Sequence, residues 1–153
     1  MFFGVEDSGA PPVLIDFQWT GCGLGMLDLA MHLFHSVSFS AMDDGGEEQL
    51  FLLYHSELTK RLRPEAAARY TLAVARRHYA LCLVDYSRVI FSRFWNGKTP
   101  ETFEKNAKNM NSTMLTRDIQ CVVRFIDRVD KCLALLEEER SGGFDPIQWE
   151  QWR

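Results

Sequence analysis

The last third of the chain carries apolar residues at alternating spacings of four and three, and this pattern constrains the fold more than any other feature. The positions are Leu115, Ile119, Val122, Ile126, Val129, Leu133 and Leu136. An α-helix has about 3.6 residues per turn, so these side chains fall on one stripe of its surface. The pattern predicts one long helix that packs through this stripe and ends at the Ser-Gly-Gly segment Ser141–Gly143.

Four earlier segments also have helical patterns, with acidic residues or proline at their starts. The expected helices cover Met26–His35, a segment from Asp43–Glu48 to Leu58, Pro64 to Trp95, and Thr99 to Asn106–Asn111. In the second of these helices we expect an apolar face made of Leu50, Leu53, Tyr54 and Leu58. The second half of the third helix is apolar on most sides, which predicts a central place in the core.

The N-terminal segment has a different pattern. Met1–Gly4 is apolar, Glu6–Pro12 is dense in turn formers, and Val13–Phe17 is β-branched and aliphatic, so a β-hairpin is expected. With 153 residues, of which 46% are hydrophobic, the chain can bury a sizeable core. We therefore expect a single domain over residues 1–153, mainly α with a short N-terminal β-hairpin and about five helices.

Composition excludes several classes of function. The net charge of −4 provides no large positive field, so a nucleic-acid partner is not expected. Charged residues or histidine interrupt every apolar run, so no membrane association is expected either. The four cysteines form no Cys-x-x-Cys pair, and no secretory leader pattern is found at the N-terminus. A cytoplasmic, reduced protein fits these features.

The loop after the predicted strand contains Gly21, Gly23 and Gly25. It allows three interpretations: a nucleotide site, a metal site or a tight turn. A dinucleotide loop needs Gly-x-Gly-x-x-Gly within a βαβ unit, and no second βα unit follows, so a sharp turn is favoured. Asp16, at the end of the strand, is typical either of a metal ligand or of a turn or cap residue. On these grounds both interpretations of Asp16 stay open, the metal ligand and the turn or cap residue.

Other chemical groups favour structural interpretations. The four histidines contain no His-Glu-x-x-His motif, and Cys121 and Cys132 are explained as small buried hydrophobes on one side of the last helix. The Asp43–Glu48 segment does not match a calcium loop and is interpreted as helix capping. The basic stretch Lys60–Arg63, with Arg69, Arg76 and Arg77, is interpreted as solvated helix surface, with a phosphate or acidic-substrate contact as the alternative.

The segment Asp16-Phe17-Gln18, the glycine turn and then Asp28-Leu29-Ala30 together resemble the metal-binding segment of the aminoglycoside phosphotransferase and choline kinase superfamily. The resemblance is narrower to its ecdysteroid-kinase-like (CHK kinase-like) branch, and it extends weakly through Leu52–Leu58, Asp85–Val89 and Phe94–Phe103. It implies the C-terminal lobe of a protein-kinase-like fold that transfers the γ-phosphate of ATP to a small-molecule hydroxyl. It also implies that Asp16 is a magnesium ligand and that Asp28 braces the catalytic loop.

The sequence departs from that family in two respects, because the ATP-binding lobe with its lysine is missing and so is the catalytic loop. The catalytic loop of the family has the pattern His-Gly-Asp-x-x-x-x-Asn, and no histidine of this chain is followed by Gly-Asp. The resemblance thus implies a truncated lobe without a catalytic residue, whose binding of magnesium and ATP is weak or absent. We expect a fragment that is inactive alone and could associate through an exposed N-terminal face; the alternative is a non-catalytic pseudokinase or partner-binding module. Arg76, Arg77, Asp85 and Tyr86 are candidate contacts for the acceptor.

Overall fold

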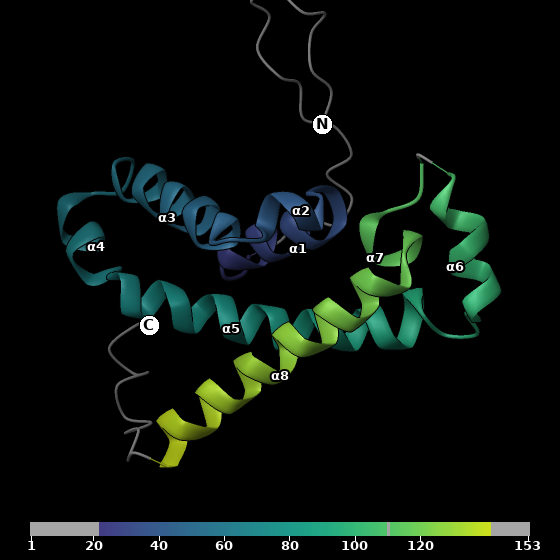
Figure 1. The fold of residues 1–153 in the computed structure, drawn as a ribbon. Helices are drawn as coiled ribbons and strands as arrows, with labels where there is room; N and C mark the ends of the chain where they lie inside the picture. Colours follow the sequence, from purple (N-terminus) through teal and green to yellow (C-terminus); the bar gives the residue numbers. More distant parts are fainter. Residues whose placement is uncertain (1–21, 110, 142–153) are drawn as a thin grey trace, which may run out of the picture.

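A computed structural model describes residues 22–109 and 111–141, and these residues form helices and turns, which confirms the mainly α class. The helices are α1 Met26–Ser36, α2 Phe39–Met42, α3 Gly46–Thr59, α4 Pro64–Arg69, α5 Leu72–Val89, the π-helical segment η1 Ile90–Phe94, α6 Pro100–Ala107, α7 Met114–Arg117 and α8 Ile119–Ser141 (Figure 1). The expected hairpin lies outside the described residues. None of the described helices combines the length and apolar composition that a bilayer crossing requires.

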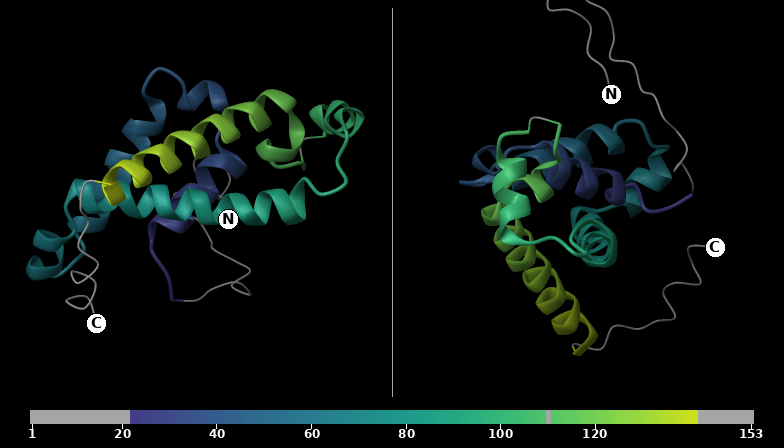
Figure 2. Two further views of the ribbon diagram at one scale, coloured as in Figure 1. Left: turned by 90° about the horizontal axis from the view of Figure 1, so that it is seen from below. Right: turned by 90° about the vertical axis from the view of Figure 1, so that its right-hand side faces the viewer.

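Helix α5 lies at the centre of the arrangement, with α1 and α8 packed against it (Figures 1 and 2). Seven of its residues are buried, which confirms the central place predicted for this segment. The largest side chains with less than 2% exposure are Phe34, Phe125, Met26, Leu33, Leu83, Ile90 and Leu115. Burying an apolar side chain of this size contributes roughly 1.5–3 kcal/mol, so contacts among α1, α5 and α8 supply most of the packing energy.

The described residues form eight α-helices, where the sequence predicted about five. One reason is a break between α4 and α5 inside the predicted helix Pro64 to Trp95. Thr71 is extended at φ −67° and ψ 163°, and its side chain accepts a hydrogen bond from the Val74 N–H at 3.3 Å. The His55 ring nitrogen Nε2 lies 2.8 Å from the Tyr70 carbonyl oxygen, which satisfies a backbone group at the break. A cap and a tertiary contact thus override a continuous helical pattern.

A second break separates α7 from α8, and Asp118 explains it. Asp118 is extended at φ −139° and ψ 136°, and its Oδ1 accepts a hydrogen bond from the Gln120 N–H at 2.9 Å. This contact caps the N-terminus of α8. The short helix α2 was not predicted. The starts of α1, α3 and α6 agree with the prediction from the sequence. At the start of α6, Thr99 and Thr102 form a capping box, and Pro100 is the first residue of the helix.

The buried face of α8 differs from the predicted stripe. The buried residues of this helix are Cys121, Phe125, Val129 and Cys132. By contrast, Ile119, Ile126 and Leu133 are 46%, 40% and 40% exposed. The predicted stripe was wrong at these three positions because the apolar part of the α8 surface is wider than the part that contacts α5. The Phe125 ring, which packs against Phe34 at a centroid distance of 5.1 Å, selects the face that turns inward.

The face predicted for α3 was also partly wrong. Leu53 is 60% exposed, whereas Phe51, which the pattern did not include, is the buried residue of the helix. Leu50 and Tyr54 are partly buried against the core. The Phe51 ring packs edge-on to the Tyr79 ring of α5 at 5.7 Å. This aromatic contact, rather than the leucine spacing, sets the rotation of α3.

Candidate functional site

The two residues singled out by the family resemblance have different outcomes in the structure. Asp16 lies outside the described residues, so its metal role stays a prediction. Asp28 lies in the first turn of α1, as expected, and is exposed. Its carboxylate is close enough to Tyr54 to contribute to the raised pKa of that hydroxyl, although burial of Tyr54 is the larger cause. The bracing role of Asp28 also stays a prediction.

The start of α1 is attached to α3 through Tyr54. The Tyr54 hydroxyl donates a hydrogen bond to the Gly25 carbonyl oxygen at 3.1 Å, across 29 positions of sequence. A Cβ at Gly25 would lie 3.2 Å from the same hydroxyl oxygen, so the close approach favours glycine there. The contact fixes the residue that directly precedes α1. Sequence reasoning gave Tyr54 only a packing role.

The candidate acceptor contacts on α5 do not gather at one site. Arg76 forms an ion pair with Glu48, and Arg77 Nε lies 3.3 Å from a carboxylate oxygen of Glu139. Asp85 pairs with Arg88 at 3.4 Å on the exposed surface. Tyr86 is buried, and its hydroxyl is hydrogen-bonded to the His35 ring. Only Arg76 of these four lines the cavity described next.

A cavity of about 240 Å³ is lined by residues of α3, α5 and α8. Its lining residues are Glu47, Glu48, Phe51, Arg76, Tyr79, Ala80, Arg128, Lys131, Cys132 and Leu135. The aromatic residues Phe51 and Tyr79 are buried, as are Ala80 and Cys132. Charged groups from all three helices surround this apolar base. Such a combination is typical of small-molecule sites, although the volume is below the usual range.

Glu47 is the most strongly bonded acid of this cavity. Its Oε1 accepts hydrogen bonds from the Tyr79 hydroxyl and from Arg128 Nε, both at 2.9 Å. Burial raises the pKa of Tyr79, and the Glu47 charge raises it further, so this hydroxyl keeps its proton. Burial disfavours the charge on Arg128, but Glu47 more than offsets this and raises the Arg128 pKa. Arg128 therefore keeps its charge, and the two bonds to Glu47 join three helices.

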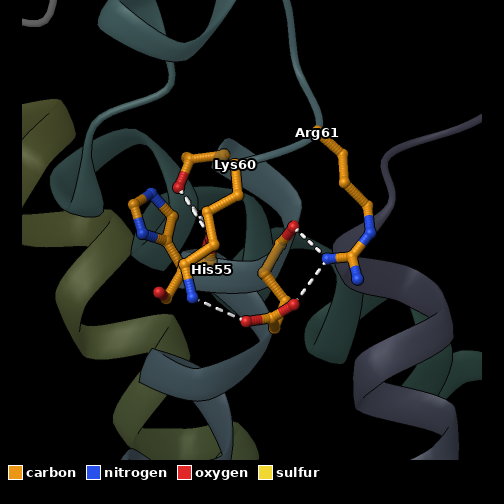
Figure 3. Close-up of polar contacts among 6 residues, drawn as sticks. His55, Lys60 and Arg61 are labelled. Carbon is orange, nitrogen blue, oxygen red and sulfur yellow. Dashed lines mark hydrogen bonds and ion pairs between the residues drawn. The ribbon is translucent and has the colours of Figure 1, made fainter.

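The basic stretch at the end of α3 forms ion pairs within its own helix turn, as Figure 3 shows. Lys60 Nζ and Arg61 Nη1 donate to different oxygens of the Glu57 carboxylate, at 2.7 and 2.6 Å. Hydrogen bonds from Lys60 and then Arg61 lower the pKa of Glu57 to about 2. All three side chains are well exposed, so these pairs contribute little to stability. This arrangement is that of a solvated helix surface.

Histidines and cysteines also take structural positions among the described residues. His35 is half-buried against Tyr86 and Phe94, and His55 stacks on Tyr70 with ring centroids 5.8 Å apart. Cys121 and Cys132 are buried, as predicted. Within residues 22–109 and 111–141, no three His, Cys, Asp or Glu side chains lie together where they could hold a metal ion.

Sequence reasoning singled out Arg76 but missed the other charged groups of the cavity. Glu47 and Glu48 were interpreted only as helix-capping residues, and Arg128 was not singled out. A signal for Arg128 was present, because it lies three residues after Phe125 and four before Cys132, on the edge of the apolar arc. A charged residue on a buried edge requires a partner. The partner is Glu47, 81 positions away, which local periodicity cannot identify.

Comparison with protein-family models, with curated proteins and with solved structures finds no match to this chain.

Proposed function

We propose that the chain is the helical, acceptor-side lobe of an ATP-dependent phosphotransferase that acts on a small-molecule hydroxyl. The observation that supports this most is the anchored start of α1, where Tyr54 holds Gly25 and Asp28 lies in the next turn. Phosphoryl transfer depends on positioning a metal-binding carboxylate against several other groups. Under this proposal the anchored Gly25 serves that positioning for Asp16, which precedes it by nine residues.

The same proposal holds that the chain alone does not transfer phosphate. It contains no His-Gly-Asp motif, and the described residues provide no group of three metal ligands. Metal binding under this proposal falls to Asp16 together with groups outside the described residues. One carboxylate holds MgATP poorly, because the transition-state charge needs several groups acting together.

The experiment is an ATP turnover and phosphotransfer assay on the purified chain, with Asp16→Asn as its matched control. We expect no turnover above background from either protein. Turnover by the unchanged chain that Asp16→Asn abolishes would overturn the proposed inactivity. Sequencing the transcript upstream of the Met1 codon tests the family assignment: an open frame encoding His-Gly-Asp-x-x-x-x-Asn supports it, and an in-frame stop codon counts against it.

A second candidate function is that of a non-catalytic helical module that binds a partner. The core of α1, α5 and α8 favours it, because these helices bury Phe34, Leu83 and Phe125 against one another within the described residues. A cooperative melting transition and a single species in sedimentation support this alternative. Aggregation of the purified chain supports the fragment interpretation instead, since a fragment leaves apolar surface uncovered.

A further inference from the structure

The cavity between α3, α5 and α8 combines an aromatic base with a charged rim. Phe51 and Tyr79, which are 3% and 5% exposed, pack edge-on and give the base a fixed shape. Leu135 is 42% exposed and adds an apolar wall that a ligand could cover. A volume of about 240 Å³ suits a molecule of about one aromatic ring with one polar substituent.

The charges that line the cavity favour an anion. Three cations line it, namely Arg76, Arg128 and Lys131, against two acids, Glu47 and Glu48, so the lining residues carry one net positive charge; Asp127, which pairs with Lys131, is not a lining residue. Both acids already accept hydrogen bonds from cations of the same cavity: Glu47 from Arg128 and Glu48 from Arg76. A cationic ligand would have to compete with these bonds for the carboxylates, whereas an anion can use N–H donors of the cations that these bonds leave over.

The two cations on α8 can provide further donors to such an anion. Arg128 bonds Glu47 through Nε, and a guanidinium carries four more N–H donors on its two Nη atoms. Lys131 pairs with Asp127 one turn away at 2.6 Å, and both side chains are more than 60% exposed. An exposed pair of this kind contributes little energy, so the Lys131 ammonium can turn toward a ligand at small cost.

We propose that this cavity binds a small monoanion with a compact apolar body, such as an aromatic carboxylate. The carboxylate is held by Arg128 and Lys131, and the ring lies against Phe51, Tyr79 and Leu135. This inference does not rest on the proposed phosphotransferase function, because its argument uses neither Asp16 nor Asp28.

Three ligands of nearly the same shape test the charge preference. Benzoate, benzamide and benzamidine are titrated into the isotope-labelled chain, and amide and methyl shifts are followed by NMR. We expect benzoate to shift the resonances of Ala80, Cys132 and Leu135 saturably, with a midpoint at or below roughly 1 mM. We expect benzamide to bind at least several-fold more weakly and benzamidine to leave these resonances unchanged.

Two exposed substitutions then test the assigned residues. Lys131→Met removes one cation and should weaken benzoate binding by about fivefold. Leu135→Glu places a negative charge at the wall and should abolish it. The control is Lys105→Met, an exposed lysine on α6, which packs against α7 rather than the cavity helices and should leave binding unchanged.

Several results would overturn the proposal. It is wrong if benzamide or benzamidine binds as tightly as benzoate, or if benzoate shifts no cavity resonance at 10 mM, roughly tenfold above the expected midpoint. It is also wrong if Lys131→Met and Leu135→Glu, shown by circular dichroism to be folded, bind benzoate like the unchanged chain. Should either variant fail to fold, the ligand series on the unchanged chain still decides.

Discussion

Tyr79, on the central helix α5, donates a hydrogen bond to the Glu47 carboxylate in the first turn of α3, at 2.9 Å. Arg128 of α8 donates to the same oxygen at the same distance. One carboxylate oxygen therefore ties three helices whose bonded residues are 32 and 81 positions apart in the sequence. The acid is only 20% exposed, so its bonds are better shielded than those at the helix surfaces.

Replacement of Glu47 by glutamine should lower the free energy of unfolding by about 2 kcal/mol, because it removes the charge that compensates half-buried Arg128. The matched control is Glu48→Gln, whose partner Arg76 is 53% exposed, and it should cost less than about 1 kcal/mol. Tyr79→Phe should cost about 1 kcal/mol for the lost hydrogen bond. Urea denaturation measures all three, and equal costs for Glu47→Gln and Glu48→Gln would contradict the bridging role of Glu47.

Gly46 should not tolerate a side chain. A Cβ at this position would overlap the Ala41 carbonyl group of α2, which is backbone and cannot move aside without displacing α2. Gly46→Ala should therefore lower stability by roughly 2–4 kcal/mol, even though alanine favours helix. Gly23→Ala is the control, since a Cβ at Gly23 would have no neighbour within 4 Å among the described residues and its cost should be below about 0.5 kcal/mol. Thermal melting of both variants provides the comparison.

The helical class could be predicted from the sequence because it depends on local spacing, and the starts of α1, α3 and α6 depend on local caps. The inward face of α8 could not be predicted in the same way. Ile126 and Phe125 are neighbours on a wide apolar arc, and either could face α5 as far as periodicity shows. The choice depends on Phe34 and Trp95, whose rings lie 5.1 and 5.7 Å from Phe125 but are distant in the chain.

Substitution of these two neighbours tests which face is buried. Phe125→Ala should lower the free energy of unfolding by roughly 3–5 kcal/mol, because Phe125 is fully buried and the cavity left behind has aromatic walls. Ile126→Ala should cost less than about 1.5 kcal/mol, since Ile126 is 40% exposed. If Ile126→Ala costs as much as Phe125→Ala, the stripe predicted from the sequence describes the buried face better than the structure does.

The position of Asp28 in the first turn of α1 could be predicted because it is local, while its bracing role stays a prediction. The cavity, by contrast, is assembled from Glu47, Tyr79 and Arg128, which come from separate helices. Each looks ordinary in its own segment: an acid at a helix start, an aromatic residue in an apolar helix, an arginine beside core positions. Their partnership follows only from how the helices pack.

The break between α4 and α5 should depend on the Thr71 cap. Thr71→Ala removes the oxygen that accepts the Val74 N–H bond and should lower stability by about 1 kcal/mol. Thr71→Ser keeps that oxygen and should cost clearly less. Denaturant titration compares the two variants, and equal losses would show that the threonine methyl group, rather than the cap, is responsible.

The lowered pKa values of His35 and His78 should make the protein less stable as the pH falls through the acidic range. Burial lowers the pKa of His35 below 6.5, and burial followed by the Arg77 charge does the same for His78. Below about pH 6.5 the unfolded chain therefore binds more protons than the folded one, so the free energy of unfolding declines as the pH decreases. One proton accounts for at most about 1.4 kcal/mol per pH unit, and less here because both rings are partly solvated.

The measurement is urea denaturation at several pH values from about 7.5 to about 5.5, for the unchanged chain, His35→Gln, His78→Gln and the double variant. Each single variant should flatten the decline, and the double variant should flatten it most, because glutamine does not titrate. The stability should level off toward about pH 7.5, where both histidines are almost entirely neutral in either state. A decline of equal steepness in the double variant would assign the pH dependence to other groups, and a rise in stability toward the acidic end of the series would contradict the direction of both pKa shifts.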